Sequence, residues 1–285
     1  MKKRWILSAL LLVLLRVPGS GQEPPLYFAL LADTQMGMYA SDRDFVRETA
    51  SYEFAAATVN RLRPEFVVIL GDLVNKPGDR DQVREFKRIT DGITVPVHLV
   101  AGNHDIGQEP TPESLAAYRS RFGRDYYSFR AGPVYGIVLN SGLIHAPQKV
   151  ADELAKQTAW LREELAAARK SGAPHVIVFQ HHPWFIRDAG ETDSYSNIPA
   201  ERRKPMLDLL GEYGVRQVFA GHAHQDSTGR AGDLEMTVTG PVSMPFGDEG
   251  SGMRLVEVGP EGVRHRYFNF SRMPDALSLE HRSPF

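Results

Sequence analysis

Five short groups of residues in this chain have the side chains that bind metal ions. In chain order they are Asp33-Thr34-Gln35, Gly71-Asp72, Gly102-Asn103-His104-Asp105, His181-His182-Pro183 and Gly221-His222-Ala223-His224. Each group follows an apolar run typical of a buried strand, so its side chains should emerge at a strand end. Oxygen and imidazole ligands gathered in this way predict a two-metal hydrolytic site.

The chemistry of a phosphoester suggests how these ligands are shared. Two cations a few ångströms apart can activate a water molecule and neutralise phosphoryl oxygens. A carboxylate can bridge two metals whereas an imidazole cannot, so Asp72 is the candidate bridge. Asp33 and Gln35 would serve one metal, and Asn103 and His181 the other. The donor set suits zinc, iron or manganese.

The remaining histidines are given separate roles. His222 and His224 lie two apart on an extended segment, so both can point into one cavity and divide between the metals. We expect His104 not to bind metal. Its neighbour Asp105 could hold the imidazole in its charged form, which would stabilise the transition state or protonate the leaving oxygen.

Strands and helices alternate along the chain and would position these groups. Strands are expected at 26–32, 66–70 and 95–101, with helices at 45–62 and 82–89; Phe54, Ala55, Val59 and Leu62 would share one face of the first helix. Two short strands within 126–140 precede a helix at 151–170, a strand at 176–179, a helix at 205–213 and strands at 215–220, 236–239, 253–258 and 263–268. Continuously apolar strands flanked by helices indicate sheets covered by helices, hence the α/β class and a single domain.

Composition narrows the classes of partner and ligand. The 285 residues carry a net charge of only -2, with no basic surface predicted, so we expect no nucleic-acid partner. The chain has no cysteine, which excludes disulfides, thiolate-bound zinc and a thiol nucleophile. Any metal must be held by oxygen and imidazole.

The N-terminus resembles a secretory signal. Basic residues at 2–4 precede an apolar run from Trp5 to Leu15 and small residues at 19–21. We expect a signal peptide over residues 1–21, a domain over 22–285, a periplasmic or secreted location and no stable membrane association after cleavage. The alternative is an uncleaved membrane anchor, although the apolar run is short for a span.

Taken together, the motifs resemble those of the calcineurin-like metallophosphoesterases, D-x-H, GD, GNH[DE], a later His and GHxH, over residues 26–224. The resemblance implies a four-layer α/β/β/α sandwich and attack by a hydroxide bound to two divalent or mixed-valence metal ions. By position it assigns Asp33, Gln35, Asp72 and His224 to one metal, and Asp72, Asn103, His181 and His222 to the other. His104, assisted by Asp105, matches the general acid. His181 is favoured over His182 because the family ligand lies two residues before Pro183.

One position departs from the family pattern. The first motif usually ends in His, where this chain has Gln35, and purple acid phosphatases place a tyrosine where this chain has Asn75. We therefore expect a looser first metal site. The Asp33–Gly37 and Gln180–Pro183 segments resemble a branch that dephosphorylates phosphoserine and phosphothreonine in proteins. Phosphomonoester hydrolysis is the leading hypothesis; a phosphodiesterase and a non-catalytic metal-binding scaffold are the alternatives.

Overall fold

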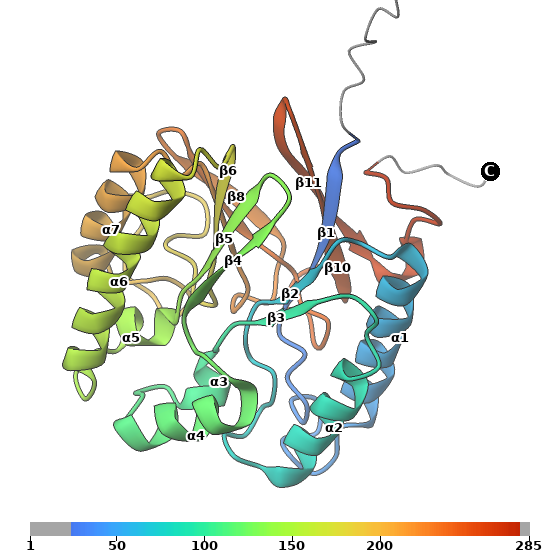
Figure 1. Cartoon of the computed structure of the whole chain (residues 1–285). Coiled ribbons are helices and arrows are strands. Elements are labelled where there is room, and N and C mark those ends of the chain that lie inside the picture. The colour runs from blue at the N-terminus through green and yellow to red at the C-terminus, as the bar shows by residue number, and fades with distance from the viewer. Residues whose placement is uncertain (1–23, 280–285) are drawn as a thin grey trace, which may run out of the picture.

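The computed structural model describes residues 24–279 and shows two β-sheets packed face to face between layers of helices (Figure 1). One sheet has the strand order β11-β10-β1-β2-β3, and the other β4-β5-β6-β7-β9-β8. The single-domain α/β/β/α sandwich expected from the sequence is confirmed.

The first sheet combines parallel and antiparallel strands. Its members are β1 (Leu26–Leu31), β2 (Val67–Ile69), β3 (Val97–Leu99), β10 (Gly252–Gly259) and β11 (Gly262–Asn269). Strands β1, β2 and β3 are parallel, and β10 runs antiparallel to both β1 and β11. Helices α1 (Val46–Leu62) and α2 (Arg80–Thr90) lie outside this sheet (Figure 1).

The second sheet has a parallel centre. Its strands are β4 (Tyr127–Ala131), β5 (Val134–Val138), β6 (His175–Phe179), β7 (Gln217–Ala220), β8 (Ser227–Ala231) and β9 (Leu234–Val238). Strands β5, β6, β7 and β9 are parallel, with β4 and β8 antiparallel at the edges. Helices α6 (Ala151–Lys170) and α7 (Ala200–Glu212) cover its outer face (Figure 1).

Strands that are apolar on both faces contribute to two cores at once. In β1, Phe28 and Leu30 pack between the sheets, whereas Ala29 and Leu31 pack toward the helices. Between the sheets Phe28 stacks on Phe66 at a centroid distance of 4.7 Å. This burial on both sides explains why the strands are continuously apolar.

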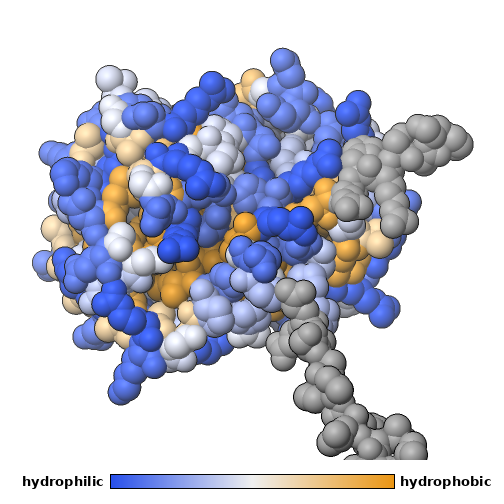
Figure 2. Space-filling view, turned by 90° about the horizontal axis from the view of Figure 1, so that it is seen from above, coloured by the Kyte–Doolittle hydropathy of each residue, from blue (hydrophilic) through white to orange (hydrophobic). Residues whose placement is uncertain are grey.

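The carboxyl ends of the parallel strands lie at one edge of the sandwich and carry the predicted site. The opposite edge, where β1 begins, is seen from above in Figure 2, and apolar side chains form a band there between polar regions. Because parallel strands place their following loops on the same side, segments distant in sequence converge at the site edge.

Several elements differ from the sequence-based expectations. Phe54 was expected to share one face of α1 with Ala55, Val59 and Leu62, but those three are buried whereas Phe54 is 47% exposed and its ring contacts that of Phe270. Helix α7 begins at Ala200, five residues before the expected Pro205. Strand β8 was not anticipated, nor were the short elements α3 (Asn103–Ile106), α4 (Pro112–Phe122), α5 (Ser141–His145) and η1 (Phe270–Arg272).

The N-terminal prediction is not addressed by this structure, since residues 1–21 lie outside the described part of the chain. Among the described residues, no helix is both long and apolar enough to cross a bilayer.

Candidate active site

All seven candidate metal ligands lie in loops that follow strands, or in the first turn of a short helix. Asp33 and Gln35 follow β1, Asp72 follows β2, Asn103 begins α3 after β3, His181 follows β6, and His222 and His224 follow β7. All are buried, with exposed fractions of 5% or less. The fold therefore buries these polar side chains, which water normally solvates well, at one edge of the sheets.

The backbone at most of these ligands is left-handed. Eight residues other than glycine have positive φ in the described chain, and five of them are candidate ligands. These are Asp33 (52°), Gln35 (39°), Asp72 (50°), His222 (71°) and His224 (52°). Such conformations are uncommon for residues with a Cβ and concentrate at functional sites.

The glycines before the ligands permit close packing between different motifs. A Cβ on Gly71 would lie 2.5 Å from Nδ1 of His181, and one on Gly102 would lie 2.2 Å from Oδ1 of Asp72. Likewise, a Cβ on Gly221 would lie 2.8 Å from Oδ2 of Asp33. Each glycine thus leaves room for a ligand supplied by another strand.

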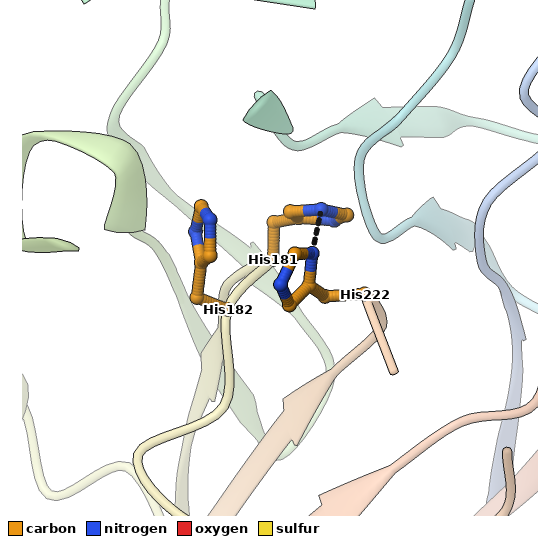
Figure 3. Close-up of side chains that lie close together, drawn as sticks. All are labelled: His181, His182 and His222. Carbon is orange, nitrogen blue, oxygen red and sulfur yellow. Dashed lines mark hydrogen bonds between the residues drawn. The ribbon is translucent and has the colours of Figure 1, made fainter. Parts of the chain in front are cut away.

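Nitrogen Nε2 of His181 is the centre of one group of ligand atoms. It lies 3.3 Å from Oδ2 of Asp72, 3.0 Å from Oδ1 of Asn103 and 3.2 Å from Nδ1 of His222. Figure 3 shows this contact between the His181 and His222 rings, whose planes lie at 70° to each other. Carboxylate, amide oxygen and two imidazole nitrogens therefore converge within one small volume.

A second group adjoins the first. Nε2 of His224 lies 3.5 Å from Oδ1 of Asp33. Asp33, Asp72 and His181 can each place one ligand atom within 4.8 Å of the others, so Asp72 belongs to both groups. Gln35 is tied to Asp72 by a backbone hydrogen bond, and its buried Oε1 has no hydrogen-bond partner among the described residues.

Backbone carbonyls hold the outer nitrogen of each imidazole. Nδ1 of His181 lies 2.8 Å from the Leu70 carbonyl, and Nδ1 of His224 lies 2.6 Å from that of Met244. Nε2 of His222 lies 2.9 Å from the Tyr195 carbonyl. A carbonyl can only accept, so each outer nitrogen carries hydrogen and the other ring nitrogen points into the cluster, where a bound metal ion would take it in its unprotonated form.

Comparison with known proteins identifies the family to which the chain belongs. A family model described as calcineurin-like phosphoesterase matches residues 26–226, well over half of the chain. The chain belongs to the calcineurin-like phosphoesterase family. It is 33% identical over 268 residues to the serine/threonine-protein phosphatase CPPED1 of Bos taurus, covering 88% of this chain and 86% of that protein. The Homo sapiens CPPED1 is 34% identical over 269 residues, with the same coverage.

A solved structure of a dimetal phosphatase from Danio rerio has the same fold, with a TM-score of 0.61. It is 18% identical and covers 87% of this chain and 100% of that one. Family membership and the phosphatase relatives establish the chain as a hydrolase that acts on phosphoesters, as the motifs predicted.

In this phosphoesterase, His182 is oriented differently from the adjacent His181. Oγ of Ser141 accepts the backbone N–H groups of His181 and His182 at 3.2 and 2.8 Å, and lies 3.0 Å from Nδ1 of His182. With both acceptor positions of the hydroxyl in use, its proton points to Nδ1. Neutral His182 then carries hydrogen on Nε2 and serves as a donor, although its ring lies close to His222 (Figure 3).

The contact expected between Asp105 and the His104 imidazole is replaced by backbone hydrogen bonds. The Asp105 carboxylate accepts the N–H groups of Leu73, Val74 and Gly102 at 2.9, 3.3 and 2.8 Å. Nδ1 of His104 lies 2.6 Å from the carbonyl of Asn75 instead. Consecutive residues of a helix face different directions, and both lie in α3, so the two side chains diverge.

The site concentrates buried charge. Burial raises the pKa of Asp33, and burial with the nearby Asp72 raises that of Asp105 to about 8. Burial opposes ionisation of Asp72, but the His181 imidazole outweighs it and holds the pKa below its usual range. Burial also acts to lower the pKa of His181, yet Asp72 raises it to about 9.

These residues fit metal ions. Two buried carboxylates lie close to three oriented imidazoles and to the Asn103 amide oxygen, and the buried Oε1 of Gln35 has no hydrogen-bond partner within residues 24–279. Cations placed there would offset the unfavourable burial of negative charge. Oxygen and imidazole donors without thiolate suit zinc, iron or manganese.

Tyr195 was not singled out from the sequence, yet its backbone carbonyl and its ring both contact His222. The only sequence signal is its place in the long segment 184–200 that follows His181 and His182, since loops at the edge of a site often carry binding residues. No periodic pattern marks a side chain that reaches the site from a loop.

Proposed function

We propose that the chain is a phosphomonoesterase that uses two metal ions. The observation that carries this proposal is the pair of adjoining ligand groups that share Asp72, one around Nε2 of His181 and the other joining Asp33 to His224. Asp33, Gln35, Asp72 and His224 would hold one ion, and Asp72, Asn103, His181 and His222 the other. When bound, the two ions supply Lewis acidity that activates water and neutralises phosphoryl oxygens.

The protein's own groups orient the ligands and move a proton. The backbone N–H of His104 donates to Oδ1 of Asp72 at 2.8 Å and fixes that carboxylate. Since Nδ1 of His104 is engaged by the Asn75 carbonyl, Nε2 is the ring nitrogen available to protonate the leaving oxygen. Asp105 is a positioning residue, because it joins the loops after β2 and β3 through their backbone N–H groups.

The proposed substrates are phosphoserine and phosphothreonine in proteins. The CPPED1 relatives carry the name serine/threonine-protein phosphatase and match along nearly all of the chain. Within residues 24–279 four large hydrophobic side chains are exposed, and two of these, Tyr195 and Phe246, lie against His222 and His224 at the site. An aromatic-edged site accessible at the surface suits a residue presented on a flexible polypeptide segment.

The test compares hydrolysis of para-nitrophenyl phosphate, its bis ester, a phosphoserine peptide and free phosphoserine by protein of known metal content. We expect two metals per chain, cleavage of the monoesters and a higher kcat/KM for the peptide than for the free amino acid. Asp72→Asn should lose both metal and activity. Faster cleavage of the bis ester would replace the proposal with a phosphodiesterase.

We further propose that the protein is exported. The proposal rests on the basic and apolar pattern of residues 1–21 and predicts a mature chain that begins near Gln22. Mass spectrometry of the protein from its natural host would show a chain lacking this segment. An intact N-terminus in a membrane fraction would instead support the anchor.

A further inference from the structure

Tyr195 lies at the mouth of the site, on the segment between β6 and α7. Its side chain is exposed by 59%, an unusual fraction for an aromatic residue with several contacts. Its ring centroid lies 4.8 Å from that of His222, and its backbone carbonyl accepts from Nε2 of the same imidazole at 2.9 Å. Tyr195 therefore combines contact with a candidate ligand and access to solvent.

The Tyr195 hydroxyl is bonded in a way that leaves its proton uncommitted. Its oxygen accepts from Nδ2 of Asn103 at 3.2 Å and from Nε2 of Gln108 at 3.1 Å. A hydroxyl has two acceptor positions and one proton, so both acceptor positions are in use. No residue within 24–279 accepts the proton in return, which makes the hydroxyl an available donor.

The amide of Asn103 shows how near this donor is to the reacting centre. Its Oδ1 lies 3.0 Å from Nε2 of His181, inside the first ligand group, while its Nδ2 reaches the Tyr195 hydroxyl. One amide group thus separates the hydroxyl from the ligand group. A phosphoryl group bound over the metals would present oxygens within reach of that donor.

The loop that carries Tyr195 is held by buried polar contacts. The guanidinium of Arg203, a residue that is 1% exposed, donates to the backbone carbonyls of Trp184 and Glu191. The Glu191 carboxylate accepts the backbone N–H of Ile186, and Asn197 donates to that same carboxylate. The burial of Arg203 thus gives the loop a fixed anchor.

We propose that Tyr195 is a catalytic residue that donates a hydrogen bond from its hydroxyl to a phosphoryl oxygen of the substrate. This proposal rests on the proposed phosphomonoesterase activity. A hydrogen bond to an anionic oxygen is stronger than one between neutral groups, and it contributes most where charge develops during reaction. A monoester has three non-bridging oxygens and a diester two, so an additional donor favours monoesters.

The experiment compares Tyr195→Phe with the wild type, with Tyr213→Phe at the end of α7 as the matched control. The substrate is para-nitrophenyl phosphate, and inorganic phosphate is the competitive inhibitor. We expect kcat/KM to fall about 100- to 1,000-fold in Tyr195→Phe, as for removal of one donor to a developing anion. The inhibition constant of phosphate should rise, while metal content stays at the wild-type value. Tyr213→Phe should match the wild type in all three measurements.

Two results would overturn the proposal. Unchanged kinetics in Tyr195→Phe would show that the hydroxyl has no contact with the phosphoryl group. Loss of metal in parallel with activity would show that Tyr195 only orients the Asn103 amide. A wild-type protein that binds metal but cleaves no monoester would refute the proposed function itself, and that result is seen before any variant is compared.

Discussion

Gly102→Ala tests whether close packing between motifs maintains the site. Gly102 has a φ of -107°, which alanine adopts without strain, so the substitution adds only a methyl group. That methyl carbon would lie 2.2 Å from both the backbone nitrogen and Oδ1 of Asp72. The perturbation therefore falls on the candidate bridging carboxylate.

The size of the effect follows from this overlap. Carbon atoms in ordinary contact with their neighbours lie roughly 3.5–4 Å away, so the loops after β2 and β3 must separate by roughly 1 Å or more. The displacement would also disturb the 2.8 Å hydrogen bond from the backbone of His104 to Asp72. A shift of 1 Å at reacting groups costs about 100-fold in rate, or about 2.7 kcal/mol. We expect at least this loss in kcat/KM, with fewer than two metals per chain.

The assay measures kcat/KM for para-nitrophenyl phosphate, metal content and the thermal transition of each variant. Gly211→Ala is the matched control, because Gly211 lies in α7 and an added Cβ there meets nothing within 4 Å. Alanine in a helix is favoured over glycine by roughly 0.5–1 kcal/mol, so this control should remain active and equally or more stable. A folded Gly102→Ala enzyme with two metals and wild-type kinetics would refute the reasoning.

Three further predictions follow from the site and the core. Gln35→Ala removes the buried amide oxygen that no described residue hydrogen-bonds, so equilibrium dialysis should show one metal bound much more weakly than the other; equal affinity would exclude Gln35 as a ligand. Burial lowers the pKa of His98 to about 4. The contribution of neutral His98 to the stability of the fold is therefore present above the unfolded-state pKa of about 6.5 and is lost as the pH falls toward 4. His98→Phe retains the stack on Phe129. In urea unfolding this variant should lose about 1 kcal/mol less stability than the wild type as the pH falls from about 6.5 to about 4, after allowance for solvent screening. An equal loss in both proteins would show that other groups cause the destabilisation by acid. Chelation of the metals should lower the melting temperature by roughly 5–10 °C, because ligand at 100 times Kd stabilises by about 2.7 kcal/mol; an unchanged transition would show that the ions do not bind the folded state preferentially.

The strands and ligand motifs were predictable because each leaves a local signal. A buried strand appears in the sequence as a short apolar run. The candidate ligands, of which Asp33 is the first and His224 the last, stand out because they are polar residues that follow such runs. The long helix at 151–170 was predicted with the bounds the structure shows, since its apolar spacing persists over many turns. Periodic patterns thus defined most of the sandwich.

Other features depend on contacts between distant segments and were missed. Adjacency of His104 and Asp105 in sequence suggested a contact, but their places in α3 send Asp105 to the backbone of the preceding loops. Phe54 has the spacing of a buried helix face, yet it meets Phe270 near the surface. Tyr195 contacts His222, 27 residues away in sequence, from a loop that Arg203 anchors.

The left-handed backbone at five candidate ligands bears on the order in which the protein folds. Each such residue costs roughly 1 kcal/mol, and together they approach the lower end of the stability of a typical domain. The phenylalanine core between the sheets can form without them, so these turns should close late and reopen first. Metal supply would then act as a folding factor as well as a catalytic one. In a metal-poor compartment, the active-site loops would be the first segments exposed to proteases.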